Sequence, residues 1–481
     1  MTVKHQAVSG VKWTSFSSFI TSSLQLIQLA FLGRFIEPSD FGLMAMVMVV
    51  IGFAQLFADM GISNAIIHRQ NTTHQELSSL YWLNIFSGLI IFFIIWFLSP
   101  TISCFYKEIR LINFLRITGL IFLIVPFGQQ FQILFQKDLK FAVLAKVEIF
   151  SSTINTLITV SFAYAGHGVY SLIIGQIAGT FFRTIYLVSA GWKKWRPSFI
   201  YSHKEVKKFM RFGLYQMGER CLRYFTMNVD YLLIGRLLGP ESLGLYSVAY
   251  QLMMKPIQIF NPVITKVAFP IFAKIQNNDS QLRNGYLQVI EIIALICMPV
   301  YFGMHAVSDS LIPLLLGHGW TNAVPIFNIL VILGMFYSLG NPIGTLLLAK
   351  GRADIGFWFN VFAFILLLPA IITGSKWGTN GVAWSLVIVT GSILFPCGFF
   401  LRWFVVKLKP IEYIRSFYSF VFIAFLMAVL VKLFDFYLPI DSPALKICIL
   451  SLSGAVFYFC FVLFFKKKAI INIVHMLWYL A

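Results

Sequence analysis

Long apolar runs alternate along the chain with short segments that are rich in glycine, proline and charged residues. These runs have the length that an α-helix needs to cross a bilayer, which is roughly 20 residues at about 1.5 Å of rise each. The hydropathy pattern therefore predicts fourteen membrane-spanning helices. The predicted spans lie near residues 13–33, 41–66, 79–102, 112–135, 143–165, 168–190, 210–236, 243–263, 287–307, 323–348, 355–374, 380–403, 413–434 and 445–465.

The composition agrees with this pattern and excludes a soluble protein. Of the 481 residues, 59% are hydrophobic and 11% are charged, and fourteen spans of roughly 20 residues would use nearly the whole apolar supply. Little remains for a large domain in water. The six cysteines are too few for a disulfide framework. We therefore expect an all-α polytopic membrane protein.

The net charge of +19 indicates orientation rather than a nucleic-acid partner. Lys and Arg collect in the cytoplasmic loops of membrane proteins. If the N-terminus is cytoplasmic, 25 of the 37 basic residues fall on the cytoplasmic side and 8 on the opposite side. The other four lie inside predicted spans. This asymmetry predicts that both termini are cytoplasmic, and no nucleic acid is expected to bind.

Two segments of the chain repeat each other at a constant offset of 202 residues. Residues 33–43 align without gaps with residues 235–245, and Gly, Arg, Pro, Gly and Leu coincide. A weaker similarity pairs residues 168–172 with residues 381–386. An even number of predicted helices separates the copies, so both halves have the same orientation, as in transporters built from parallel repeats.

The duplication predicts how the chain is organised. We expect a six-helix lobe in 1–191, a basic cytoplasmic linker in 192–209, a second six-helix lobe in 210–406, and two extra helices with a basic tail in 407–481. The linker is interpreted as an amphipathic segment that lies on anionic lipid. Two like-oriented lobes suit an alternating-access carrier better than a channel or a rigid scaffold.

Three segments resemble a known superfamily. Residues 228–250, which include Gly235-Arg-Leu-Leu-Gly-Pro240, are similar to the hallmark of the polysaccharide exporters in the multidrug/oligosaccharidyl-lipid/polysaccharide superfamily. Residues 32–43 and 57–67 resemble the same superfamily. The similarity is in particular to Wzx-type flippases of the colanic-acid-exporter-like branch.

This resemblance implies a function, a location and partners. It implies a multi-pass protein of the bacterial inner membrane that moves undecaprenyl-diphosphate-linked oligosaccharide from the cytoplasmic to the periplasmic leaflet. The movement is expected to occur by alternating access and to be coupled to an ion gradient. The expected partners are the polyprenyl-diphosphate-linked oligosaccharide and membrane lipid, and a polysaccharide polymerase is a candidate partner.

Polar and charged residues are concentrated in the seventh predicted span. A charged side chain in a bilayer costs a few kcal/mol, so such residues usually have a partner or a role. This span carries Gln216, Glu219, Arg220, Arg223, Asn228 and Asp230, and helical spacing puts Glu219, Arg220, Arg223 and Asp230 on one face. Lys255 adds a cation in the eighth predicted span.

We interpret Arg220, Arg223 and Lys255 as the lining of a water-filled cavity that binds the diphosphate, because a guanidinium can bind two phosphate oxygens at once. The alternative is a buried pair of Glu219 and Arg223 that fixes helix packing. Arg220 has the further alternatives of pairing with Glu219 or extending to the interface. Pro256 directly follows Lys255 and would place it at a kink.

Carboxylates inside the spans are the candidates for ion coupling, because a buried acid can carry a proton. These candidates are Glu219, Asp230 and Asp59, and the polar Gln216 and Asn228 accompany them. For Asp59 we favour a structural role near the end of its helix, since Gly61 follows it. Sodium is the alternative to the proton.

Other functions lack their sequence motifs. No phosphate-binding loop occurs and the histidines have no metal-ligand spacing, so we expect no cofactor, no metal and no catalytic residue. A multidrug or cation antiporter of the same superfamily, the first alternative, would need an anionic cavity. The second alternative is a membrane polysaccharide polymerase or ligase, which would need a large outer loop. Its candidate catalytic groups are His305 and Asp309, which helical spacing puts on one face.

Overall fold

The computed structural model describes residues 3–59, 66, 72–437, 440 and 442–480, and the side chains of 3–9, 11, 59, 203–217, 219, 262–267, 269–271, 353 and 466–480 lie outside this description. The described residues are almost all helical and contain no strand. The chain divides into two compact units, which we call unit 1 (Met1–Gly244) and unit 2 (Leu245–Ala481).

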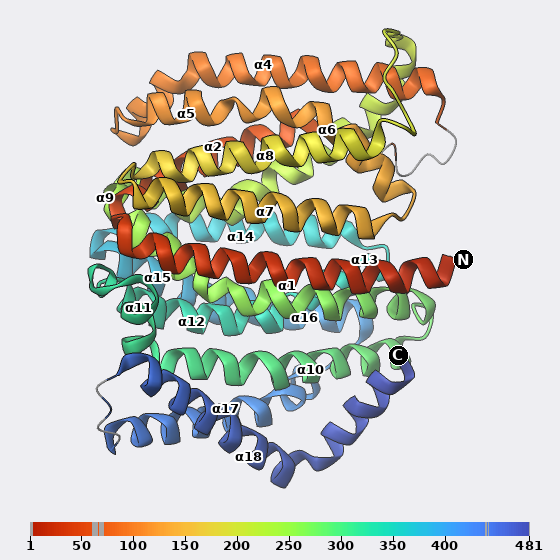
Figure 1. Ribbon diagram of the computed structural model, residues 1–481. Helices are drawn as coiled ribbons and strands as arrows, with labels where there is room; N and C mark the ends of the chain where they lie inside the picture. Colours follow the sequence, from red (N-terminus) through yellow and green to blue (C-terminus); the bar gives the residue numbers. More distant parts are fainter. Residues whose placement is uncertain (1–2, 60–65, 67–71, 438–439, 441, 481) are drawn as a thin grey trace. The chain divides into compact units, whose positions relative to one another are not determined.

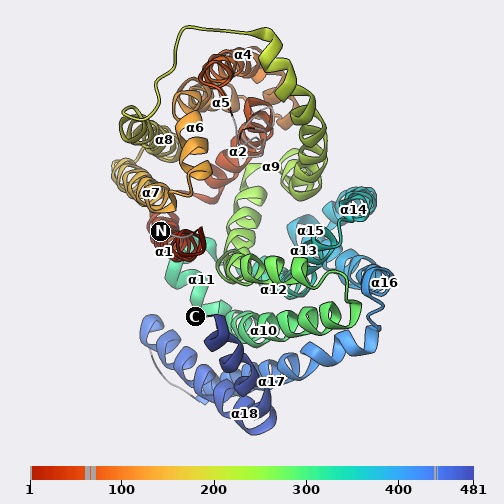
Figure 2. The same cartoon turned by 90° about the vertical axis from the view of Figure 1, so that its right-hand side faces the viewer.

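Unit 1 is a bundle of long helices that lie alongside one another (Figure 1). Its helices are α1 (Val3–Phe35), α2 (Pro38–Asp59), α4 (His74–Tyr106), α5 (Leu111–Gly119), α6 (Ile121–Lys137), α7 (Phe141–Tyr164), α8 (Val169–Gly191) and the first part of α9 (His203–Lys274). α7 packs on α1 and α8, whereas α6 packs on α4 and α8. Figure 2 looks along these helices and shows α6 beside both α2 and α8.

Unit 2 contains the rest of α9 and the helices that follow it. These are α10 (Asp279–Ala306), α11 (Ser308–Leu316), η1 (His318–Trp320), α12 (Ala323–Gly340), α13 (Pro342–Ala349), α14 (Ala353–Gly374), η2 (Ser375–Trp377), α15 (Gly378–Val389), η3 (Thr390–Leu394), α16 (Phe395–Val406), α17 (Pro410–Tyr437) and α18 (Pro443–Leu480). α10 packs against α12 and α17, and α17 packs against α18.

The predicted fold class and the predicted number of about fourteen spans are confirmed. In the described part of the chain, 11 segments are long and apolar enough to cross a membrane. One of them, Asp354–Val406, has 53 residues and contains two passes, α14 and the continuous series α15–η3–α16. The backbone of α9 leaves the helical region at Gly239, where φ is 86°, and the two helical parts on either side contain the predicted spans 210–236 and 243–263. Together these segments account for fourteen passes.

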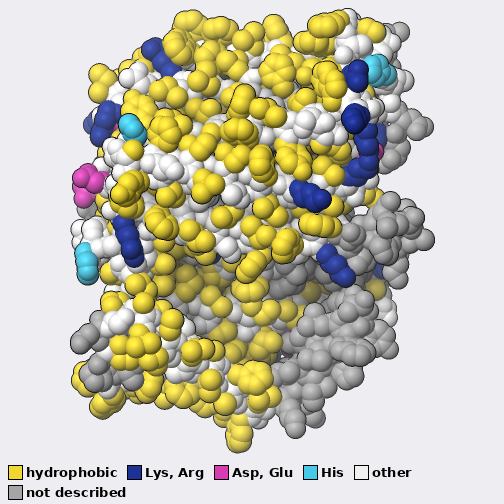
Figure 3. All heavy atoms as spheres, viewed as in Figure 1, with side chains coloured by type: hydrophobic (Ala, Val, Ile, Leu, Met, Phe, Trp, Pro, Cys, Tyr) yellow, Lys and Arg dark blue, Asp and Glu magenta, His cyan; other side chains and the backbone are white. Residues whose placement is uncertain are grey.

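The outer surface of unit 1 is hydrophobic along most of the helix lengths. Figure 3 shows this face, on which hydrophobic side chains predominate and most Lys and Arg side chains lie toward the helix ends. Large apolar side chains protrude from it, among them Phe97, which is 73% exposed. Water would solvate such a continuous apolar surface poorly, whereas the acyl chains of a bilayer match it. Unit 1 is therefore built to be surrounded by lipid.

Local signals explain where several helices begin and end. α4 starts at a capping box, in which the Thr73 hydroxyl accepts from the Glu76 backbone N–H at 3.2 Å and the Glu76 carboxylate accepts from the Thr73 N–H at 2.8 Å. It ends at Tyr106, and the capping residue Lys107 adopts the left-handed conformation with φ of 58°. Gly239 turns the chain within α9 because glycine tolerates its positive φ, and Pro240 then starts the next helical segment.

The two copies of the repeated segment meet in space within unit 1. A Cβ atom on Gly42 would overlap the carbonyl oxygen of Pro240, and a Cβ atom on Gly244 would overlap the carbonyl oxygen of Pro38. Pro240 and Gly244 are the repeat equivalents of Pro38 and Gly42, so the contact is reciprocal, as in a two-fold symmetric interface. The repeat thus has a physical role, since its glycines allow two helix starts to touch through their backbones.

The first part of the basic linker is not helical and contacts the helices of unit 1, while the predicted amphipathic segment on lipid stays a prediction. Residues 195–202 are not helical, and Trp195 packs against Tyr81 and Phe131, with ring centroids 5.7 and 5.5 Å away. The Trp82 indole donates to the Ser198 carbonyl at 2.8 Å. The aromatic residues of this basic stretch therefore bind the segment to protein, a contribution that the charge pattern did not reveal.

A buried arginine organises one end of unit 2. Arg402, which lies at the end of the predicted span 380–403, is only 2% exposed, and its guanidinium donates to the hydroxyls of Tyr286 at 2.8 Å and Tyr413 at 3.2 Å. The Tyr413 ring lies 4.1 Å from the guanidinium carbon, and its hydroxyl donates to the Leu339 carbonyl at 2.7 Å. Hydroxyl oxygens and a cation–π contact thus compensate the buried charge and join α10, α12, α16 and α17.

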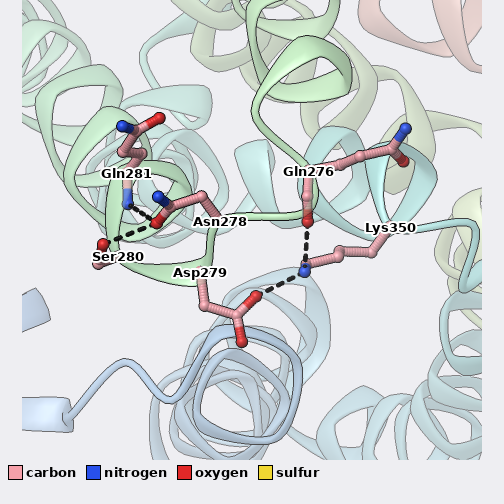
Figure 4. A network of polar contacts seen from close by, with 6 residues as sticks. All are labelled: Gln276, Asn278, Asp279, Ser280, Gln281 and Lys350. Carbon is pink, nitrogen blue, oxygen red and sulfur yellow. Dashed lines mark hydrogen bonds and ion pairs between the residues drawn. The ribbon is translucent and has the colours of Figure 1, made fainter.

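A second polar network joins the junction before α10 to the end of α13 (Figure 4). The Lys350 ammonium donates to the Gln276 carbonyl and to the Asp279 carboxylate, at 2.6 Å each. Asn278 caps α10 by accepting from the Gln281 backbone N–H at 3.1 Å. Lys350 is one of the 25 basic residues predicted to lie on the cytoplasmic side. The network therefore lies at the end of unit 2 that is predicted to face the cytoplasm.

Candidate functional site

The residues predicted to form the polar face of α9 differ in how exposed they are. Arg223 is exposed and has no hydrogen bond or ion pair with the described residues, whereas Arg220 is half-buried. Asp230 is 5% exposed, and its carboxylate accepts from the Tyr231 backbone N–H at 2.9 Å. Asn228 donates to the Tyr224 carbonyl at 2.8 Å, one helical turn away. The face therefore combines exposed cationic and buried polar parts.

Three predicted site residues lie outside the description of side chains. They are Gln216, Glu219 and Asp59. Their roles remain predictions, as does the pairing of Arg220 with Glu219. The exposure of Arg223 disfavours the alternative of a buried pair with Glu219, because such a pair requires both groups to be shielded from solvent.

An aromatic anchor fixes this part of α9 to α2. The Tyr224 hydroxyl donates to the Val49 carbonyl at 2.8 Å, and the space for it exists because residue 52 is glycine. The Phe53 ring lies 4.8 Å from the Phe225 ring, measured between centroids. Since Arg223 directly precedes Tyr224, this anchor fixes the backbone that carries the exposed guanidinium within unit 1.

A cavity of about 420 Å³ lies on the other side of α2, between α2, α6 and α8. Its volume is typical of small-molecule sites, which span roughly 300–1,000 Å³. Ile51, Gln55 and Ala58 of α2 line it at helical spacing. Val49, Gly52 and Phe53 lie on the face of α2 that meets α9, so α2 separates the cavity from the cationic helix.

The lining of this cavity is rich in amides and contains one cation. Its polar residues are Gln55 from α2, Gln129, Gln132 and Gln136 from α6, and Gln176, Thr180, Arg183 and Thr184 from α8. The Arg183 guanidinium donates to the Gln132 side-chain oxygen at 3.2 Å. Among the described lining residues there is no Asp or Glu. The cavity is therefore a hydrogen-bonding site with a positive charge.

The sequence prediction did not assign this cavity a role. Arg183 is one of the four basic residues that lie inside predicted spans, and the sequence offers no partner for it. Two spacings in the sequence could have indicated the cavity. Gln129, Gln132 and Gln136 lie on one face of α6, and Gln176 and Arg183 lie on one face of α8. Each face alone has few polar residues, and they form a site only when α6 packs on α8.

Lys255 belongs to unit 2 and is half-buried. The backbone of α9 leaves the helical region at Gly239, whereas the kink expected beside Lys255 stays a prediction, because a proline can bend a helix while φ and ψ remain helical. Glycine at a positive φ changes the chain direction more sharply than a proline accommodated within a helix.

The predicted His305–Asp309 face is wrong. α10 ends at Ala306 and α11 begins at Ser308, with Val307 between them at φ −104° and ψ 6°. The two residues therefore belong to different helices and do not share the spacing on which the enzyme alternative depended.

Comparison with known proteins identifies relatives along nearly the whole chain. The model of a family described as polysaccharide biosynthesis protein matches residues 31–325. The teichuronic acid biosynthesis protein TuaB of Bacillus subtilis (strain 168) is 37% identical over 86% of each chain. The lipopolysaccharide biosynthesis protein WzxC of Escherichia coli (strain K12) is 34% identical over 81% of this chain and 79% of its own.

Among solved structures, the fold is similar to that of the lipid II flippase MurJ in its inward closed conformation. The TM-score is 0.79, with 16% identity over 96% of this chain and 100% of the other. At this identity the likeness establishes a shared fold and nothing finer.

Proposed function

Because the chain belongs to the polysaccharide biosynthesis protein family, we propose that it is a flippase for polyprenyl-diphosphate-linked oligosaccharide. It carries this lipid from the cytoplasmic to the periplasmic leaflet of the bacterial inner membrane by alternating access. The relatives are named for the biosynthesis of teichuronic acid and lipopolysaccharide. The fold similarity to a lipid II flippase supports only that the chain has a fold on which such a carrier can be built.

The exposure of Arg223 is the observation that supports a substrate with a negatively charged headgroup. The exposed Arg223 has no counter-charge among the described residues, although its helix crosses the membrane. An uncompensated guanidinium in a span is costly unless an anion binds it or water reaches it. In our proposal the anion is the substrate diphosphate, bound by Arg223 together with Arg220, while Asp230 and Glu219 are the candidates for ion coupling. Lys255, which belongs to unit 2, stays a candidate cation for the same substrate.

The alternative functions fit less well. A carrier of cationic drugs needs carboxylates in its binding cavity, and the described lining of the unit 1 cavity has none. A polymerase or ligase needs a catalytic group, and its candidates, His305 and Asp309, do not share the helical face on which that alternative rests. The relatives we compared are named for biosynthetic pathways, so a non-enzymatic transport step within such a pathway fits both the names and the geometry.

Depletion of the protein in its host tests the function directly. We expect lipid-linked repeat units to accumulate in the cytoplasmic leaflet, measured by their accessibility to an impermeant glycan-modifying enzyme in sealed vesicles of each orientation. Unpolymerised units in the periplasmic leaflet would instead identify an enzyme. Drug sensitivity without any lipid intermediate would identify an antiporter.

The proposed orientation, with both termini in the cytoplasm, gives a further prediction. Asp138 lies between α6 and α7 and His167 between α7 and α8, and both are exposed. In a variant whose six native cysteines are replaced, we expect an impermeant maleimide to label His167→Cys from the periplasm and Asp138→Cys only after the membrane is permeabilised. The reverse labelling would contradict the orientation.

A further inference from the structure

The cavity between α2, α6 and α8 is chemically unlike a diphosphate site. A diphosphate has several negative charges, and proteins usually bind such a group with several cations. The lining of this cavity has a single cation, Arg183, amid amides and hydroxyls. The lining therefore suits a ligand other than the diphosphate, or another part of the transported molecule.

The amides define the first property of that ligand. Each glutamine side chain offers both a carbonyl acceptor and an NH₂ donor. A sugar hydroxyl likewise donates and accepts, so a wall of amides complements a polyhydroxylated ring more completely than it complements a metal ion or an ammonium group. Phe122, Val125 and Leu187 add apolar surface to the same cavity, against which the C–H groups of a ring can pack.

Arg183 defines the second property. One of its guanidinium nitrogens donates to the Gln132 oxygen at 3.2 Å, and the described residues provide no ion-pair partner for it. Gln132 thus orients the guanidinium without neutralising it. The donors that remain suit a carboxylate, which accepts two parallel hydrogen bonds from a planar fork. One cation and one carboxylate balance in charge, whereas a phosphate dianion would leave an excess negative charge.

We propose that this cavity of unit 1 binds a sugar unit that carries one carboxylate, such as a hexuronic acid, within the transported oligosaccharide. Arg183 binds the carboxylate, and the glutamines of α6 and α8 bind the ring hydroxyls. The proposal rests on the proposed function, because it takes the substrate to be a saccharide. It adds that the carrier selects for an acidic sugar at a site separate from the one that binds the diphosphate.

Ligand binding to the purified full-length protein in detergent tests this proposal. The probes are methyl β-D-glucuronoside and its neutral counterpart, methyl β-D-glucoside, observed by saturation-transfer NMR with titration. We expect the glucuronoside to bind about tenfold more tightly, since a charge-assisted bidentate pair is stronger than neutral hydrogen bonds. Equal binding of both probes, binding of neither, or displacement of the glucuronoside by equimolar inorganic phosphate would overturn the proposal.

Three variants locate the effect. Arg183→Gln should remove the preference for the glucuronoside, and Arg183→Lys should retain part of it because the charge remains. Arg196→Gln is the matched control, since Arg196 is exposed outside the cavity, and it should keep the full preference. If Arg183→Gln does not fold, retention by Arg183→Lys still supports the assignment, and a preference unaffected by either substitution would refute it.

The test is independent of the depletion experiment. If depletion causes cytoplasmic-leaflet accumulation but the protein binds both probes equally, the flippase function stands and the acidic-sugar site fails. If the glucuronoside is preferred but no lipid-linked units accumulate, the site stands as a sugar site and the proposed function fails.

Discussion

Reversal of the charge at Arg223 is expected to abolish export while the protein still inserts into the membrane. Arg223→Glu replaces a fork that binds phosphate oxygens by a carboxylate that repels them, and each lost charge-assisted bond is worth about 1.5–3 kcal/mol. A reduction of export by at least about a hundredfold follows. The measurement is the rate at which lipid-linked units reach the periplasmic leaflet, normalised to the amount of protein in the membrane.

Two controls make this result specific. Arg223→Lys keeps the charge but loses the planar fork, so we expect reduced rather than abolished export. Arg196→Glu makes the same charge reversal at an exposed position in the linker and should leave export unchanged. Export at the wild-type rate from Arg223→Glu would remove this residue from the substrate site, even though its exposure in a membrane-crossing helix would then lack an explanation.

The spans were predictable because each is a separate, long apolar run. Where the structure differs, local polar residues are the reason. The predicted span 287–307 corresponds to α10, which begins earlier, at Asp279. Asn278 caps it, and its polar first turns bury Leu282 and Tyr286 completely. A hydropathy window averages these buried residues with their polar neighbours, so it places the start of the helix too late.

Tertiary contacts account for what the sequence prediction missed. The burial of Arg402 depends on Tyr286, which lies 116 positions away, and no local pattern distinguishes it from a loop cation. Similarly, Gln132 and Arg183 meet only because α6 and α8 pack together. The predicted lobes 1–191 and 210–406 stay a prediction, because the compactness of units 1 and 2 does not test whether the halves are homologous.

Substitution of either repeat glycine is expected to destabilise the protein markedly. Gly42→Ala or Gly244→Ala introduces a methyl group against a backbone carbonyl, which cannot move away by changing a rotamer as a side chain could. The helix starts must then separate, at a cost of about 3 kcal/mol each, the upper part of the usual range for overpacking. The measurement is the thermal unfolding of the purified protein in one detergent. Gly344→Ala is the matched control, because a Cβ there meets no atom within 4 Å.

The double variant separates a shared contact from two independent ones. The two glycines oppose each other, so a Cβ on Gly42 would lie 3.0 Å from the Gly244 nitrogen, and a Cβ on Gly244 would lie 3.1 Å from the Gly42 nitrogen. Once the first methyl group has separated the helices, the second meets less resistance. We therefore expect the double variant to lose clearly less stability than the sum of the single losses. Additive losses would mean that the two glycines contribute to stability independently, and that the reciprocal contact does not couple them.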